Sequence, residues 1–351
     1  MDVEPAALRS AVQRYGQALV TVDSHTAGEP TRLVVAGLPL LPGSTINERR
    51  LYMRQHLDHV RLLLTREPRG HRDMFAAVLT EPTSPAADFG LIYMDARRYP
   101  YMCGHATIGA VTTALELGWL EAEAGSAERR VVVDTPSVAV EALAELEADP
   151  SGSIRVKAVT LQMEAAFVQA TGIPISVPNF GRVDVDLVCV GGYFAMVSAD
   201  QVPFDLATAH TADLARLGMA IIGASNEQLE IEHPTRKYVN TVDVTEFYGQ
   251  DADGLSRNAV VYGEAHVDRS PCGTGTAAKL ALLHHHGQLE VGDSLENRGL
   301  LEAAFQGRIV AETQVGQHAA IVPEIRGSAH VTGVHHFVVG ADDPFPKGFL
   351  F

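Results

Sequence analysis

The chain has 351 residues, enough for two domains with a core each, and 43 acidic against 27 basic residues give a formal net charge of −16. Because Lys and Arg form no cluster, this charge argues against nucleic acid or an anionic membrane as a partner. No apolar stretch approaches the roughly 18 residues that cross a bilayer, and the N-terminus lacks a basic-then-apolar signal pattern. We therefore expect a cytoplasmic protein that binds a small molecule.

The first part of the chain predicts a sheet interrupted by two helices. Thr45 and Glu48 have the spacing of a capping box, which predicts a helix from there through about Thr65. A second helix is expected to begin at Cys103. The charged segment 121–130 reads as a surface loop. The expected strands are a pair within 18–37, then 73–82, 88–95, 131–145 and 154–163.

The second part predicts another set of strands around a helix near 205–221. The turn-rich segment 147–153 is the best candidate for the boundary between two domains. Cys189 lies in a β-branched run that reads as a core strand, where a free cysteine is a small buried group. The remaining expected strands, which a Pro/Gly-rich tail follows, are 240–249, 257–268, 308–316, 319–334 and 335–340.

The other two cysteines open segments that resemble each other. Cys103 and Cys272 are each followed by a glycine, Gly104 or Gly273, and then by an apolar helix that another glycine ends 15 residues after the cysteine. The two cysteines lie 169 residues apart, about half the chain. Such long-period similarity indicates two related halves.

A thiol at the start of a helix has a specific chemistry. The unpaired backbone N–H groups and the helix dipole favour the thiolate and lower the thiol pKa, and the same N–H groups bind carboxylates. If two such helix ends face one ligand, one thiolate can remove a proton from the carbon next to a carboxylate. The other thiol then delivers a proton to the opposite face, which inverts the stereocentre.

Cofactor sites are weaker interpretations of the same residues. The segment 273–278, GTGTAA, matches a dinucleotide fingerprint with Asp293 beyond it, but it follows DRSPC instead of a strand and gives the cysteine no role. The runs His284–His286 and His335–His336 suggest a metal. Adjacent helical side chains point in different directions and neither run has acidic residues at the spacing of metal ligands, so we expect solvated histidines.

Two further alternatives involve the cysteines themselves. Three cysteines without a CxxC pair indicate neither a disulfide framework nor zinc. A papain-like hydrolase that pairs Cys103 with His105 would leave the second cysteine turn unexplained. A non-enzymatic amino-acid-binding module, in which both cysteines are only packed, stays open, and its ligand would show no exchange of the α-proton with solvent.

Four segments together resemble the proline racemase family: DSHTAGEP (23–30), EPRGHRDMF (67–75), MCGHATIG (102–109) and DRSPCGTGT (268–276). This family also contains 4-hydroxyproline 2-epimerases and trans-3-hydroxy-L-proline dehydratases. The resemblance implies that Cys103 and Cys272 are the catalytic acid–base pair. Because proline is a secondary amine, it forms no ordinary pyridoxal imine, so we expect neither a pyridoxal cofactor nor a metal.

The resemblance also implies the residues that bind the substrate. His105 and Asp268 match side chains that bracket the amine and the carboxylate. The positions that hold the carboxylate correspond to Gly104, Gly273 and Thr274, and the side chains that wall the ring correspond to Phe75 and Tyr262. Tyr262 stands where the family more usually has phenylalanine, which adds a hydroxyl group to the pocket and leaves the ring specificity open.

The implied fold is α+β, with two pseudo-symmetric domains of the diaminopimelate-epimerase type, each a curved sheet or barrel around a central helix. Residues 1–152 would carry Cys103, residues 153–335 would carry Cys272, and residues 336–351 would complete the first domain. The family also implies a homodimer. Dehydratase members typically have threonine instead of the second cysteine, so Cys272 favours a proline racemase first, a 4-hydroxyproline epimerase second and a trans-3-hydroxy-L-proline dehydratase last.

Overall fold

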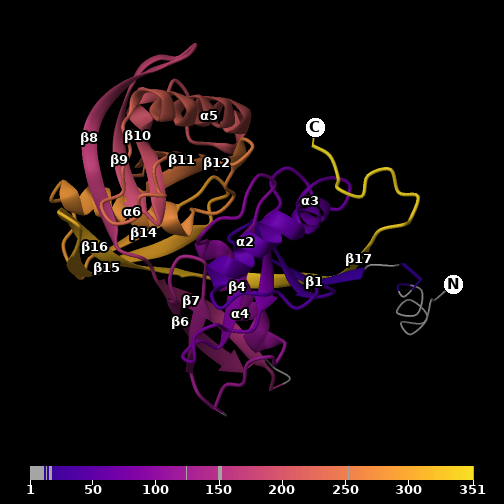
Figure 1. Cartoon of the computed structure of the whole chain (residues 1–351). Coiled ribbons are helices and arrows are strands. Elements are labelled where there is room, and N and C mark those ends of the chain that lie inside the picture. Colours follow the sequence, from indigo (N-terminus) through magenta and orange to yellow (C-terminus); the bar gives the residue numbers. More distant parts are fainter. Residues whose placement is uncertain are drawn as a thin grey trace.

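The computed structural model describes residues 12, 14–15, 18–123, 125–148, 152–251 and 253–350. Within these residues, seventeen strands join into one continuous hydrogen-bonded sheet. The sheet curves around the helices, so that the molecule is β-rich and barrel-like (Figure 1). None of the helices in the described part of the chain is long and apolar enough to cross a membrane.

The strands before residue 163 agree with the expected ones except that the expected strand 131–145 is two strands, which a turn at 135–139 separates. The helices of this part are α2 (Ile46–His56), α3 (Asp58–Thr65) and α4 (Gly104–Glu116). The strands are β1 (Ala18–Thr26), β2 (Glu29–Ala36), β3 (Ala76–Thr80), β4 (Phe89–Met94), β5 (Glu128–Asp134), β6 (Val140–Ala148) and β7 (Ile154–Gln162).

The remaining elements form a second set of strands around two helices. The helices are α5 (Thr211–Gln228) and α6 (Gly273–His285), with short 3₁₀ turns at Ala199–Gln201 and Thr208–His210. The strands are β8 (Ala166–Val177), β9 (Gly181–Val190), β10 (Gly192–Ser198), β11 (Val242–Gln250), β12 (Ser256–Tyr262), β13 (His266–Val267), β14 (Ser294–Arg298), β15 (Ala304–Val315), β16 (His318–Gly327) and β17 (Ala329–Val338).

Strands wrap both helices that begin after a cysteine. Every residue of α4 from Gly104 to Leu115 is buried, because small and apolar side chains occupy all faces of this helix. It packs against β1, β2, β7 and β17, whereas α6 packs against β8, β9, β15 and β16. The two helices share one apolar core, in which Ile108 and Leu280 both contribute.

The end of the chain returns to its beginning. Strand β17 pairs antiparallel with β1, from Ala18 opposite Val338 to Thr26 opposite Ala329. Beyond this strand, Arg69 forms an ion pair with Asp343 and donates a hydrogen bond to the Val338 carbonyl at 3.1 Å. The last described residues therefore lie against the segment that follows α3.

The helix expected from Thr45 to Thr65 is two helices. Thr45 does cap the first one, since its Oγ1 accepts a hydrogen bond from the Glu48 N–H at 3.1 Å. At Leu57 the backbone leaves the helical region, with φ −126° and ψ 21°. The change in direction lets the buried Arg61 side chain donate to the Ala96 carbonyl at 2.7 Å, a contact that the local sequence does not reveal.

Other boundaries also differ from the expected ones. Helix α5 begins at Thr211 because the preceding residues form a 3₁₀ turn, and it continues to Gln228 because its buried face extends to Ser225. Part of the expected surface loop 121–130 belongs to β5, and its residue 124 lies outside the described residues. The predicted domain boundary at 147–153 lies between β6 and its antiparallel partner β7, and its residues 149–151 lie outside the described residues.

Candidate active site

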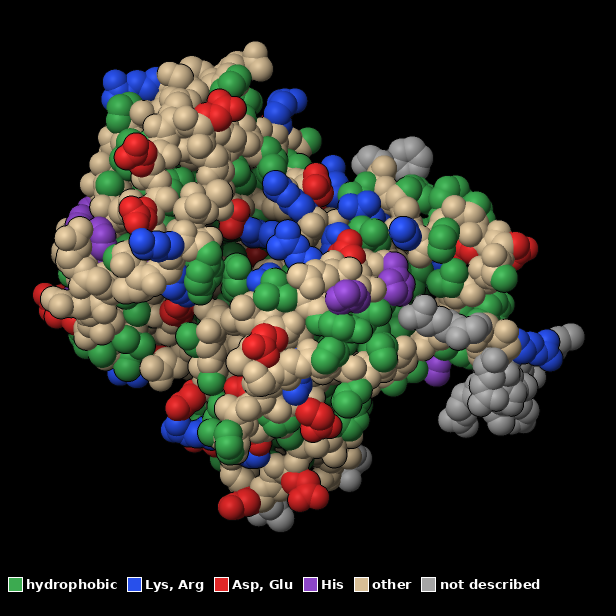
Figure 2. All heavy atoms as spheres, in the orientation of Figure 1, with side chains coloured by type: hydrophobic (Ala, Val, Ile, Leu, Met, Phe, Trp, Pro, Cys, Tyr) green, Lys and Arg blue, Asp and Glu red, His purple; other side chains and the backbone are tan. Residues whose placement is uncertain are grey.

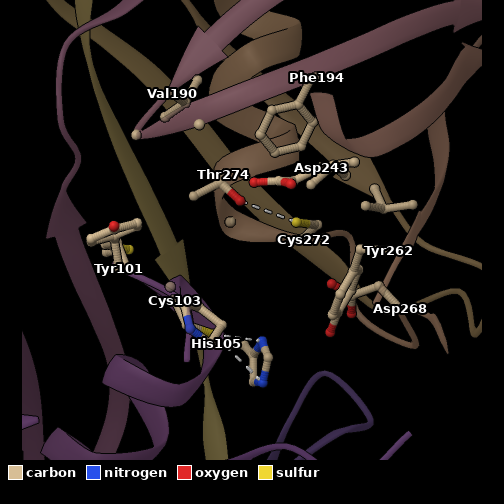
Figure 3. A pocket seen from close by; sticks show the side chains of 18 of the residues that line it. Tyr101, Cys103, His105, Val190, Phe194, Asp243, Tyr262, Asp268, Cys272 and Thr274 are labelled. Carbon is tan, nitrogen blue, oxygen red and sulfur yellow. Dashed lines mark hydrogen bonds between the residues drawn. The ribbon is translucent and has the colours of Figure 1, made fainter. Parts of the chain in front are cut away.

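All of the predicted site residues line one pocket where α4 and α6 begin. The pocket has a volume of about 160 Å³. Figure 3 shows Cys103 on the side of α4 and Cys272 on the side of α6. The other predicted residues in its wall are Phe75, Gly104, His105, Tyr262, Asp268, Gly273 and Thr274.

The two helices meet at their first residues. A Cβ atom added to Gly104 would lie 3.3 Å from the Cα of Gly273, and one added to Gly273 would lie 3.3 Å from the Cα of Gly104. Both positions thus require glycine because of a close approach between backbones. The approach points the free N–H groups of both helices at the same small volume, which is a suitable site for a carboxylate.

Cys103 occupies the N-cap of α4 in ordinary extended backbone, with φ −151° and ψ 116°. Its Sγ lies 3.2 Å from Nδ1 of His105. Its carbonyl accepts hydrogen bonds from the Thr107 N–H at 3.1 Å and from the Thr107 hydroxyl at 2.7 Å. The thiol is therefore held at the start of the helix with a histidine beside it.

Cys272 occupies the N-cap of α6 in a different way. Its φ of +57° lies in a region that residues other than glycine rarely adopt, and strain of this kind concentrates at functional sites. Its Sγ accepts a hydrogen bond from the Gly275 N–H at 3.3 Å and lies 3.4 Å from the Thr274 hydroxyl. Its own N–H donates to the Ser270 hydroxyl at 3.0 Å.

The expectation that the helix ends lower the thiol pKa values is wrong. Cys103 and Cys272 are each only 8% exposed. Burial raises the pKa of both thiols well above the ordinary value and outweighs the N–H groups of Ala106 and Gly275. A thiolate formed here is consequently a stronger base than a free cysteine thiolate.

Acidic and histidine side chains gather beside the two thiols. Glu29 lies 2.8 Å from Nε2 of His266 and accepts a hydrogen bond from the Arg269 N–H at 2.8 Å. Burial opposes charge on both, yet the attraction between them lowers the pKa of Glu29 and raises the pKa of His266. Burial, together with the Glu29 charge, raises the pKa of Asp268 to about 7.

Aromatic rings form the walls on this side. The Phe75 ring packs edge-on against His105 with a centroid distance of 4.8 Å, and burial lowers the pKa of His105 to about 4. The Tyr262 ring stacks on His266 at 4.4 Å. Its hydroxyl oxygen lies 3.5 Å from Nε2 of His266, so this hydroxyl group is buried and does not face bulk water.

Sequence reasoning missed several residues of the pocket. Arg98 and Asp243 both line it and form an ion pair at 2.7 Å. Figure 3 shows Phe194 and Val190 on the side of Asp243 and Tyr101 on the side of Cys103. The sequence could have indicated Glu29, because this residue belongs to the segment 23–30 that resembles the family. No sequence pattern marked Asp243 as a pocket residue, since it lies in an ordinary alternating strand.

The weaker cofactor interpretations find no support in this geometry. Gly275 of the dinucleotide-like segment lies beside the Glu246 carboxyl group, since a Cβ added to it would lie 2.6 Å from Oε2 of Glu246. An ionised carboxylate at this place would repel a pyrophosphate group. His285, His286, His335 and His336 are exposed. Among the described residues, no group of three or more His, Cys, Asp or Glu side chains could hold a metal ion.

Comparisons with known proteins agree on one family. The family model described as "Proline racemase" matches residues 21–350. A proline racemase of Clostridioides difficile is 39% identical over 96% of this chain and 99% of its own length. A trans-3-hydroxy-L-proline dehydratase of Burkholderia cenocepacia is 37% identical with the same coverage. The crystal structure of a hydroxyproline epimerase from Agrobacterium vitis with bound trans-4-OH-L-proline is 28% identical and has a TM-score of 0.87, covering 96% of each chain.

Proposed function

Since the chain belongs to the proline racemase family, we propose that it is an isomerase that inverts the α-carbon of proline and needs no cofactor. The observation that carries this proposal is the meeting of two cysteine-capped helix ends in one pocket. Cys103 and Cys272 are the acid and the base. An amino-acid-binding module would not need two thiols in opposite walls.

The proposed reaction begins with the carboxylate at the joined helix ends, where Gly104, Gly273 and Thr274 offer hydrogen-bond donors. His105 and Asp268 hold the ring nitrogen. One cysteine, as thiolate, takes the α-proton, and the negative charge spreads onto the carboxylate. The other cysteine, as thiol, donates its proton to the opposite face of the carbon. The product leaves with the protonation states of the two sulfur atoms exchanged.

Burial supports this chemistry in two ways. The raised pKa of each thiol makes the corresponding thiolate basic enough to act on a carbon acid. The lowered pKa of His105 keeps its ring neutral, so one ring nitrogen accepts a hydrogen bond from the substrate ammonium group. The site thus holds the amine without adding a second positive charge beside it.

Epimerisation of 4-hydroxyproline at the α-carbon is the second candidate. Arg98 and Asp243 place donors and acceptors in a wall that is otherwise largely apolar, and a ring hydroxyl group could bind there. Discrimination between the two substrates depends on such a partner. Dehydration of trans-3-hydroxy-L-proline ranks last, because Cys272 supplies the second acid that inversion requires.

We also propose a pseudo-symmetric architecture of the diaminopimelate-epimerase type and a cytoplasmic homodimer. The reciprocal approach of Gly104 and Gly273 and the strands around both cysteine helices support the symmetry. The first half would comprise residues 1–152 with 336–351, and the second half residues 153–335. The ion pair between Arg69 and Asp343 supports the assignment of the tail to the first half.

The test combines substrates with variants. L-proline, trans-4-hydroxy-L-proline and trans-3-hydroxy-L-proline are incubated in D₂O after dialysis against a chelator, and chiral chromatography and α-deuterium content are measured. We expect inversion and exchange of proline. A tenfold loss of rate corresponds to about 1.4 kcal/mol in the activation barrier. Cys103→Ser and Cys272→Ser should each lose far more than this. Cys189→Ala, which removes a buried thiol of β9, should keep the wild-type rate.

Three results would count against the proposal. Retention of activity within about tenfold in either serine variant would exclude the two-thiol mechanism. Activity that disappears with the chelator and returns with a divalent ion would show that a metal is required. Binding without deuterium in the α-position of any of the three ligands would indicate a binding module.

A further inference from the structure

A buried polar cluster lies behind Cys272. Glu246 of β11 and Asn258 of β12 are fully buried, and the Asn258 side-chain amide donates to Oε1 of Glu246 at 2.9 Å. The same amide nitrogen donates to the Pro271 carbonyl at 2.8 Å. Both protons of the amide are thereby used, and they tie the carboxyl group to the peptide that enters Cys272.

The same peptide is held from the helix as well. The Thr276 hydroxyl donates to the Pro271 carbonyl at 3.2 Å and accepts from the Asn297 amide at 3.0 Å. Two groups, the Asn258 amide and the Thr276 hydroxyl, therefore fix the carbonyl of Pro271. This peptide precedes the residue with φ +57°, so the contacts hold Cys272 in a conformation that it would otherwise leave.

The second oxygen of Glu246 faces the active-site turn. Oε2 has no hydrogen-bond partner and lies where a side chain on Gly275 would be, 2.6 Å from the position of its Cβ. Gly275 is the residue whose N–H donates to the Cys272 sulfur. A charge on Glu246 therefore acts on this thiol across a single glycine, in a region from which water is excluded.

Cys103 is supported differently: a buried carboxylate that acts on it, Glu29, is paired with His266 at 2.8 Å. The corresponding position at α4 is held by neutral groups: the Tyr93 hydroxyl lies 2.7 Å from the Thr107 hydroxyl, which donates to the Cys103 carbonyl. Cys103 has ordinary backbone angles. The two thiols of one pocket thus differ in what supports them.

We propose that Glu246 is a positioning residue for Cys272 and sets the protonation preference of this thiol alone, with Asn258 as the link. The inference rests on the proposed function, in which Cys272 is one of the two acid–base groups. When Glu246 is ionised it keeps Cys272 as the thiol, and when Glu246 is protonated the thiolate forms more easily. The two sulfur atoms are consequently not interchangeable at rest.

The charges around the cluster agree with this assignment. Burial raises the pKa of Glu246 to about 7 against the attraction of Lys279, so its charge changes near neutral pH. Burial is the main cause of the raised pKa of Cys272, and Asp268 and Glu246 add to it. The titratable groups that face the two residues are Lys279, Tyr248, Tyr262 and Asp268.

Alkylation resolved by site tests the proposal without a substrate. The full chain is treated with iodoacetamide between about pH 6 and pH 8.5, and mass spectrometry follows the peptides of Cys103, Cys189 and Cys272. In Glu246→Gln we expect Cys272 to react roughly three to ten times faster than in the wild type near pH 8.5, and at the same rate near pH 6. Cys103 should react equally in both proteins, and Glu290→Gln, at an exposed position, should match the wild type.

The wild type provides a second measurement should Glu246→Gln fail to fold. Asp268, whose pKa is also raised to about 7, acts on both thiols, and Glu29 acts on Cys103. The depression of the alkylation rate near pH 7 should therefore be deeper for Cys272, on which Glu246 also acts, than for Cys103. Identical profiles would overturn the proposal. So would equal acceleration of both thiols in Glu246→Gln, which indicates a loosened fold. Failure of the racemase assay would leave these rates unaffected and would refute only the proposed function.

Discussion

For the single residues of the pocket, burial is the dominant influence. Two thiols, a carboxyl group and an imidazole lie together where water is nearly excluded, and their pKa values move in the directions that favour the neutral forms: up for Cys103, Cys272 and Asp268, down for His105. His266 and Glu29 are charged only because they pair. Apart from charged pairs such as Glu29 and His266, these groups favour their neutral forms.

In the proposed mechanism the second thiol decides the type of reaction, and Cys272→Thr tests this role. Removal of the α-proton by Cys103 remains possible in this variant, but protonation from the opposite face does not. We expect loss of proline and 4-hydroxyproline inversion, by at least about a hundredfold, and a trace of dehydration of trans-3-hydroxy-L-proline, whose leaving hydroxyl group departs as water. Chiral chromatography and detection of the keto form of the product measure both activities.

Two results of this variant would contradict the argument. Rapid inversion of proline by Cys272→Thr would show that Cys272 is not the second acid–base group. A variant that neither inverts nor dehydrates would leave the role of Cys272 standing and refute the change of reaction. Cys272→Ser is the matched control, because its hydroxyl group lacks the methyl group that restricts the threonine rotamer.

Among the elements, the contact between α4 and α6 builds the site. Neither helix alone offers more than an ordinary N-terminus, but the contact between Gly104 and Gly273 directs two sets of N–H groups at one volume. Most residues of both helices are small or apolar, and the strands bury α4 from Gly104 to Leu115 and most of α6 up to Leu282. They therefore cannot shift apart without opening the core that they share.

Gly104→Ala tests this contact. The added methyl group would lie 3.3 Å from the Gly273 backbone, too close for both helices to keep their positions. We expect a loss of about 1–3 kcal/mol in the free energy of unfolding and a fall in kcat that exceeds the change in KM. Thermal unfolding and initial-rate kinetics provide the two numbers.

Gly223→Ala is the matched control in α5. Its added methyl group meets nothing within 4 Å and the position is exposed, so the higher helix propensity of alanine should stabilise the fold by roughly 0.5–1 kcal/mol. Unchanged activity is expected. If Gly104→Ala behaved like Gly223→Ala, the contact between the two helix ends would not matter for the site.

Over the whole molecule, charge is distributed unevenly. The chain has a formal charge of −16, yet Figure 2 shows Lys and Arg side chains gathered beside a hollow in the middle of one face. Some acidic groups, in contrast, are buried without full compensation: Asp268 and Glu246 both have pKa values raised to about 7. Stability should therefore depend on pH through these groups.

The sign follows from linkage. The pKa of Asp268 is about 7 in the folded chain and close to 4 in an unfolded one, so its contribution to stability is present below about pH 4 and is lost as the pH rises through 7. Asparagine does not titrate, so the stability of Asp268→Asn does not fall in this way as the pH rises. We expect the free energy of unfolding of the variant, relative to the wild type, to rise by ~1–3 kcal/mol between pH 4 and pH 8.

Urea unfolding at several pH values checks this prediction. The asparagine can still accept the hydrogen bonds that Ser270 donates to Oδ1 of Asp268 at 2.8 and 2.7 Å, so the local structure should be kept. A difference between the two proteins that is constant with pH would mean that Asp268 has an ordinary pKa in the fold.

The sequence by itself determined the local parts of the site. A glycine after each cysteine, a following apolar helix and a glycine that ends it were enough to predict α4 and α6 with their N-caps. The predicted site residues all lie in the pocket. The local pattern indicated the two cysteines and their glycines, whereas the substrate-binding roles came from the resemblance to the family. The first strand pair and the core position of Cys189 follow from residue type and alternation in the same way.

Only the tertiary structure decided how these parts act on one another. The break between the helices at Leu57 accompanies the hydrogen bond from Arg61 to the Ala96 carbonyl, 35 residues further along the chain. The ion pair between Arg98 and Asp243 joins residues 145 positions apart. The direction of the thiol pKa shift was wrong from sequence because the helix end is local, whereas burial comes from strands throughout the chain. Electrostatic energy depends on everything around a group, and a sequence pattern specifies only its neighbours along the chain.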